Sequence, residues 1–92
     1  MKNVTYPTLN LKATGERIKT LRKERGITVM EIAEFMGFQE PKAVYKWQKG
    51  ECLPTVDNLY ALSRLFCTTI EEILVSDDKD SSAGVMLFEI AA

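Results

Sequence analysis

Histidine is absent from this chain of 92 residues, and cysteine occurs only twice. Without histidine the chain lacks the commonest general base and the commonest protein ligand for metals, so we expect neither a zinc site nor another metal site. Cys52 and Cys67 are too few for a disulfide framework, and we expect both to be reduced and structural. The sequence also holds no paired-carboxylate or nucleophile motif, so we expect a protein that is not an enzyme and needs no cofactor.

Long hydrophobic runs are also missing. No apolar stretch approaches the ~20 residues that a membrane-spanning helix needs, and the N-terminal sequence MKNVTYPTLNLK lacks the apolar segment of a signal peptide. We therefore expect a cytoplasmic protein with no membrane partner. Hydrophobic residues still make up 46% of the chain, which is enough for the core of one small domain.

Charge is balanced overall but divided between the two halves of the chain. The formal net charge is −1, yet residues 1–50 carry ten Lys and Arg against five Glu, whereas residues 51–92 carry two against eight Asp and Glu. A nucleic-acid-binding protein needs no high overall pI if its cations share one surface. The division alone also fits a solvated basic helix followed by an acidic tail. Only the position of the cations on the helices can distinguish a nucleic-acid-binding surface from this alternative.

Five helices can be predicted from the signals at their ends. Threonine precedes four of them as an expected N-cap, and glycine follows the first three. Glutamate stands three residues after two of these threonines, in the position of a capping box. The expected helices are a first at 15–25 after Thr14, a second from Thr28 to Gly37, a third at 40–49 with Pro41 at its first position, a fourth after Thr55 and a short fifth after Thr69.

The third expected helix separates its cations from its apolar residues. At about 100° per residue, one side carries Lys42, Tyr45, Lys46 and Lys49, and the opposite side carries Ala43, Val44 and Trp47. A short helix that is fixed by one face and presents cations on the other suits a phosphate-lined groove. The pattern therefore predicts a DNA-binding domain.

Four motifs resemble, when taken together, the phage-repressor, Cro-like helix-turn-helix family of bacterial transcription regulators. They are LRKERGIT, the GF turn, VYKWQKGECLPTVDNL and IEEIL. The resemblance implies a compact all-α bundle of five helices, of the lambda-repressor-like type, in which the second and third helices form the helix-turn-helix. It also implies homodimers on partly palindromic operators in double-stranded DNA. We accordingly expect an N-terminal extension at 1–13, the DNA-binding domain at 14–75 and a linker with an apolar tail at 76–92.

The resemblance also implies roles for individual residues. The start of the recognition helix would meet base edges or nearby phosphates, its next turn would face the groove, and its last lysine would reach the adjacent phosphates. The expected DNA-binding residues are Gln39, Pro41, Lys42, Tyr45, Lys46, Lys49 and, in the first helix, Arg22. Val44 and Trp47 match core positions, so we expect Trp47 to be a core anchor and not a platform for stacking bases.

The chain departs from the family pattern at several positions. Gln48 stands where many members have a glutamate that pairs with the arginine matching Arg22, so the same link should persist without charge assistance. Val29 replaces a polar residue that touches phosphate, and the turn at 37–40 is one residue longer than in the phage repressors. Cys67 stands where the family often has glycine, which predicts a left-handed backbone there.

Both ends of the chain extend beyond the resemblance. Residues 77–84, DDKDSSAG, have the composition of a linker, and Val85–Ile90 is a compact apolar run with strand-like residues. Asn3–Tyr6 is a second candidate for a short strand. Two interpretations stay open: the ends are unstructured tails, or the apolar run pairs as a strand with the N-terminus or with a second subunit.

Two classes of function are compatible with these patterns. The first is a sequence-specific DNA-binding regulator, a repressor that occupies its operator as a dimer. The second is a helical protein-interaction module, antitoxin-like or coactivator-like, in which DNA binding is lost or secondary. The lysine face favours the first class, whereas the acidic half and the apolar tail are what the second would use. No small-molecule ligand is evident.

Overall fold

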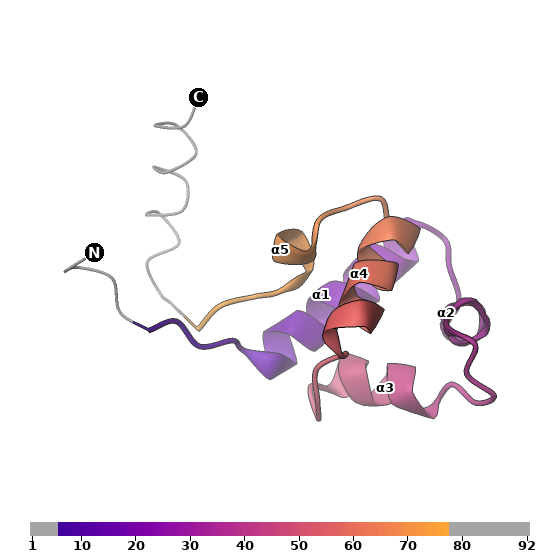
Figure 1. Ribbon diagram of the computed structural model, residues 1–92, viewed down its shortest axis with the longest axis horizontal. Coiled ribbons are helices and arrows are strands. Elements are labelled where there is room, and N and C mark those ends of the chain that lie inside the picture. The colour runs from indigo at the N-terminus through magenta and orange to yellow at the C-terminus, as the bar shows by residue number, and fades with distance from the viewer. Residues whose placement is uncertain (1–5, 78–92) are drawn as a thin grey trace.

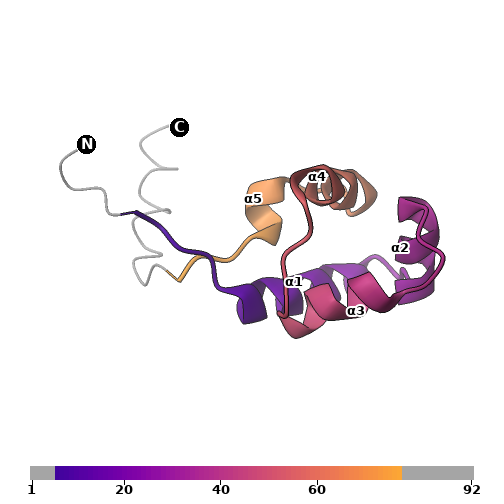
Figure 2. The same ribbon diagram turned by 60° about the horizontal axis from the view of Figure 1, so that its bottom comes forward.

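The structure, a computed structural model, describes residues 6–77 and contains five helices there. They are α1 (Leu11–Glu24), α2 (Val29–Met36), α3 (Lys42–Lys49), α4 (Val56–Leu65) and α5 (Ile70–Ile73). Helices α1 and α3 lie side by side, α2 stands at one end of this pair, and α4 and α5 cover it from across the core (Figures 1 and 2). The predicted all-α bundle of five helices is confirmed.

The capping signals of α2 and α5 and the glycine that ends α3 act as predicted. The predicted start of α3 is wrong by two residues: the helix begins at Lys42, and Pro41 is its N-cap and not its first helical residue. The Thr28 hydroxyl accepts the Glu31 N–H at 3.0 Å while the Glu31 carboxylate accepts the Thr28 N–H at 2.8 Å, which closes the capping box of α2. Thr69 and Glu72 form the equivalent box at α5. At the end of α3, Gly50 adopts φ 78°, and a Cβ there would lie 2.7 Å from the Lys12 Cα atom. Glycine is therefore required at this turn both by its backbone angle and by the close approach of α1.

The predicted start of the first helix is wrong. Helix α1 begins at Leu11 rather than at Gly15, because Asn10 caps it: the Asn10 Oδ1 atom accepts the Ala13 N–H at 2.8 Å. Helix α1 thus occupies part of the segment assigned to an N-terminal extension. Thr14 is buried inside the helix, and its hydroxyl accepts the Val75 N–H at 2.9 Å. This hydroxyl binds a segment that is distant in the sequence, and the local sequence pattern does not reveal such a contact.

Helix α4 begins after Thr55 as predicted, but the threonine makes no side-chain cap. Its hydroxyl donates instead to the Asp57 Oδ1 atom at 2.6 Å. This hydrogen bond is the main cause that lowers the pKa of the Asp57 carboxyl below its usual value. After α4 the chain passes through Cys67 with φ 56°, so the predicted left-handed backbone at this cysteine is confirmed.

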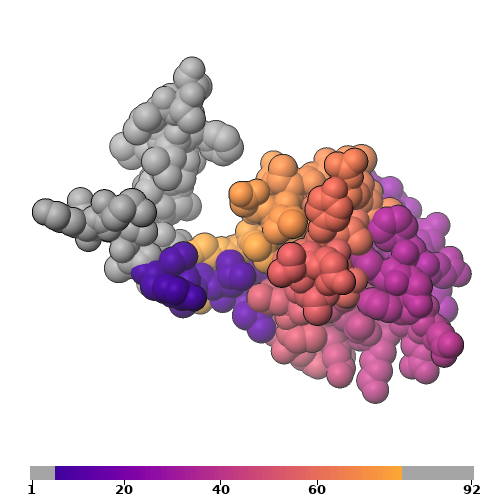
Figure 3. Space-filling model, viewed as in Figure 1, coloured from indigo at the N-terminus to yellow at the C-terminus, as the bar shows by residue number. Residues whose placement is uncertain are grey.

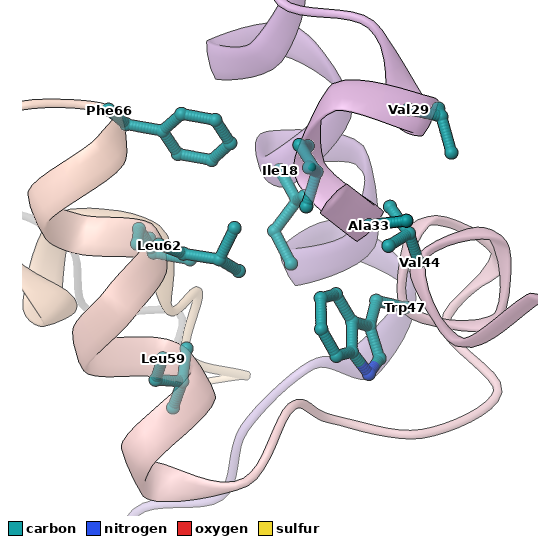
Figure 4. Packing of buried hydrophobic residues seen from close by; sticks show 10 residues of the cluster. Ile18, Val29, Ala33, Val44, Trp47, Leu59, Leu62 and Phe66 are labelled. Atoms are coloured by element: carbon teal, nitrogen blue, oxygen red, sulfur yellow. The ribbon is translucent and has the colours of Figure 1, made fainter. Parts of the chain in front are cut away.

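One hydrophobic cluster joins all five helices. Its members are Ile18, Val29, Ile32, Ala33, Val44, Trp47, Leu59, Leu62, Phe66 and Ile73. Trp47 lies in the middle of the cluster, with Leu59 and Leu62 on one side and Val44 on the other (Figure 4). At the end of α4, Phe66 is fully buried while Leu65 is half-buried, so Phe66 completes the apolar stripe of that helix.

The segments before α1 and after α5 meet at an antiparallel bridge between Leu9 and Ser76. The Asn10 N–H donates to the Val75 carbonyl oxygen at 2.8 Å, and the Asp77 N–H donates to the Thr8 carbonyl oxygen at 2.8 Å. This bridge and the Thr14 hydroxyl fasten the end of the described chain to α1. The predicted strands at residues 3–6 and 85–90 lie outside the described residues, Tyr6 excepted, as does all but the first residue of the predicted linker.

Candidate nucleic-acid interface

Helix α3 presents its predicted polar face to solvent. Lys42, Lys46 and Lys49 are exposed, Tyr45 is half exposed, and Val44 and Trp47 on the opposite side are buried. Residues 6–77 form one ion pair, between Arg25 and Glu24. No carboxylate of this part of the chain therefore neutralises the three lysines. The face is therefore a cluster of unpaired positive charge on a helix that is fixed from behind.

The core fixes α3 through Trp47. This side chain is 4% exposed and packs edge-to-face on Phe38, with ring centroids 5.9 Å apart. The prediction that Trp47 is a core anchor is confirmed. From the other side, Gly15 of α1 lies so close to α3 that a Cβ atom would collide with the carbonyl oxygens of Trp47 and Gln48. Gly15 thus sets the spacing between the two helices.

Sequence reasoning missed this role of Gly15. The sequence pattern marked it only as the first residue of a helix, whereas it lies four residues inside α1. Glycine in a helix interior costs about 1 kcal/mol relative to alanine. Such a residue is itself a signal of close packing, and it would have been recognised here if the start of α1 had been placed correctly.

Arg22 links α1 to α3. Its Nε atom donates to the Gln48 Oε1 atom at 2.9 Å, and its Nη1 atom donates to the Ile27 carbonyl oxygen at 3.0 Å. The predicted link between Arg22 and Gln48 is therefore present, with a neutral acceptor. Because these two donors hold α3 and the turn before α2, Arg22 positions the interface in addition to its predicted role in contacting DNA.

A hollow of about 560 Å³ adjoins the lysine face where α1, α2 and α3 meet. It is lined by Lys19, Arg22, Thr28, Val29, Met30, Tyr45, Gln48 and Lys49. Three of these residues are cationic, and Thr28 marks the N-terminus of α2, where the helix dipole also favours anions. Lys19 and Met30 were not among the predicted site residues, because they are not on α3 and, unlike Arg22, match no position to which the resemblance gives a role.

The remaining predicted residues lie in the turn between α2 and α3. Gln39 is exposed, and Pro41 is half-buried immediately before the first residue of α3. Figure 3 shows side chains of this region and of α3 projecting from the lower edge of the molecule. The turn and α3 thus form one continuous surface, to which the predicted site residues other than Arg22 belong.

In the part of the chain that the structure describes, no group of three or more His, Cys, Asp or Glu side chains could hold a metal ion. None of the five helices is long and apolar enough to cross a membrane.

Comparison with known proteins places this arrangement in a family. No family model matches the chain. An HTH-type transcriptional regulator from Archaeoglobus fulgidus is 30% identical over 64 residues, which cover 70% of this chain and 90% of that protein. The chain belongs to the HTH-type transcriptional regulators. The transcriptional activator BcrR from Enterococcus faecalis is 29% identical over 64 residues, which cover 70% of this chain but only 31% of BcrR.

The fold of this HTH regulator also resembles a solved structure. The restriction-modification controller protein C.AhdI from Aeromonas hydrophila superimposes with a TM-score of 0.62 at 21% identity, over 68% of this chain and 94% of that one. At this identity the likeness concerns the fold. In this chain, α2, the turn and α3 correspond to the helix-turn-helix that the sequence predicted.

Proposed function

We propose that this HTH regulator binds double-stranded DNA sequence-specifically, with α3 in the major groove. The observation that carries the proposal is the unneutralised face of Lys42, Lys46 and Lys49 on a helix whose other side is anchored by Trp47. Such a face gains affinity by releasing counterions from phosphates. Gln39, Pro41 and Lys42 meet base edges or adjoining phosphates at the start of the helix, and Lys49 meets the backbone at its end.

The regulator acts as a homodimer and represses by occupying its operator. Two copies related by a two-fold axis would place their recognition helices about 34 Å apart, one turn of DNA, on a partly palindromic site. Occupancy of such a site needs no further activity of this chain. Repression is therefore the simplest consequence of binding by a domain of this size.

Selection of bound duplexes from a random DNA pool tests this proposal. We expect enrichment of a partly palindromic sequence with half-sites about ten base pairs apart. A protein with its helix-turn-helix intact but no enriched sequence would contradict sequence-specific binding.

A helical protein-interaction module is the second candidate function. Val56 is 78% exposed and Tyr60 is 58% exposed, and the two lie one turn apart on α4. An apolar pair on the outside of a helix is a feature of surfaces that contact other proteins. The selection distinguishes the two candidates, because an interaction module would enrich no duplex.

The apolar run at residues 85–90 is the element that we propose for dimerisation. As a β-strand, this run would expose unpaired backbone N–H and C=O groups, which a strand of another copy can satisfy across a two-fold axis. We therefore propose that the run pairs with a second copy of the chain.

Truncation after Asp80 should therefore weaken the dimer, and with it operator affinity, without unfolding the five helices. Sedimentation of the truncated and untruncated chains side by side measures the effect, and circular dichroism checks the helices. Equal dimer populations in the two would remove the apolar run from the mechanism and favour α4 and α5 as the interface.

A further inference from the structure

Two large apolar side chains stand at the cationic hollow beside α3. Met30 is 51% exposed and Tyr45 is 48% exposed, and both line the hollow together with Lys19, Arg22 and Lys49. Met30 comes from the first turn of α2 and Tyr45 from the first turn of α3. The fold thus adds an apolar portion to a surface whose other features suit the negatively charged DNA backbone.

The chemistry of Met30 indicates what this portion contacts. A thioether donates no hydrogen bond and carries no charge, so Met30 gains nothing from a phosphate. The ring of Tyr45 offers an apolar edge, although its hydroxyl can still reach a polar group. Among the groups that base pairs present in the major groove, the C5-methyl group of thymine is the apolar one. A methyl group is the partner from which both side chains gain free energy, because contact removes apolar surface from water.

We propose that Met30 and Tyr45 form the contact for the C5-methyl group of a thymine in each half-site, and so determine part of the sequence specificity. The inference rests on the proposed DNA binding by α3 and deepens it. It assigns recognition of one base to an apolar contact that spans α2 and α3, in addition to the polar contacts of the lysine face.

Replacing thymine by uracil removes this methyl group and changes nothing else in the major groove. In the selected operator, thymines are replaced by deoxyuridine one position at a time, at the same position of both half-sites. The dissociation constant of the full chain is measured for each duplex. At one of these positions we expect the affinity to fall about fourfold for each half-site, which is the effect of removing one methyl group from an apolar contact. Met30→Ser and Tyr45→Ser should each bind the thymine duplex more weakly and respond less to the same replacement.

Two control variants separate this contact from other effects. Phe35 lies on α2 like Met30 and is 53% exposed, but it does not line the hollow, so Phe35→Ser should respond to uracil as the parent does. Lys49→Ala should weaken binding to the thymine and uracil duplexes by the same factor, because a phosphate contact does not sense the methyl group. Circular dichroism confirms that each variant keeps its helices.

The outcomes also separate this inference from the proposed function. An operator that binds equally with uracil at every position would overturn the methyl contact and leave DNA binding by α3 in place. The same holds if Met30→Ser and Tyr45→Ser keep the full response to uracil. If selection enriches no duplex at all, the proposed function fails and the inference fails with it.

Discussion

Trp47→Ala is expected to remove a large part of the domain's stability. Truncation of a buried tryptophan costs about 3–5 kcal/mol through lost burial and the cavity left behind, and small domains have only about 5–15 kcal/mol in total. Trp47 is 4% exposed, lies between α4 and the remainder of the core, and packs on Phe38. Its loss would therefore release α3 from the bundle. Urea denaturation followed by circular dichroism measures the change.

Tyr45→Ala provides the matched control for this prediction. Tyr45 lies two residues earlier on the same helix and is 48% exposed, so its truncation should change the free energy of unfolding far less than that of Trp47. A Trp47→Ala protein that melts like the parent and loses only its DNA binding would show that Trp47 contacts DNA.

Much of this fold follows from local signals in the sequence. The capping boxes of α2 and α5 and the left-handed turns at the glycines after α2 and α3 depend on interactions within a few residues. The left-handed backbone at Cys67 is predicted by the resemblance to the family and not by a local pattern. The two faces of α3 likewise follow from helical periodicity alone. For this reason the helix order, the core position of Trp47 and the exposed lysine face could be predicted.

Features that depend on distant contacts could not be predicted in the same way. Thr14 is a favourable N-cap residue by type, but in the fold its hydroxyl binds the backbone of Val75 and Asn10 caps α1 instead. Gly15 is required because another helix passes its Cα atom, and the hollow combines residues from three helices. In each case the residues in contact are far apart in the sequence, so no local pattern predicts the contact.

The second large effect expected is the loss of operator binding in Lys42→Ala/Lys46→Ala. A dimer would lose four cations from its recognition helices, and each contact of this kind with a base is worth about 1–3 kcal/mol. We therefore expect operator affinity to fall roughly 100-fold or more, and the log–log slope of affinity against salt to become shallower by about 0.9 for each phosphate that is no longer neutralised. Both lysines are exposed and unpaired within residues 6–77, so the helices and the melting temperature should not change.

The measurement that tests the central claim most directly compares this variant with Lys23→Ala/Arg64→Ala. The control removes the same charge from exposed positions on α1 and α4 that neither belong to α3 nor line the hollow beside it. Operator affinity of the parent and both variants is measured at one salt concentration, after circular dichroism has shown equal helicity. If α3 recognises DNA, only Lys42→Ala/Lys46→Ala loses binding. If it binds as tightly as the parent, or if both variants lose affinity to the same extent, α3 does not recognise the operator.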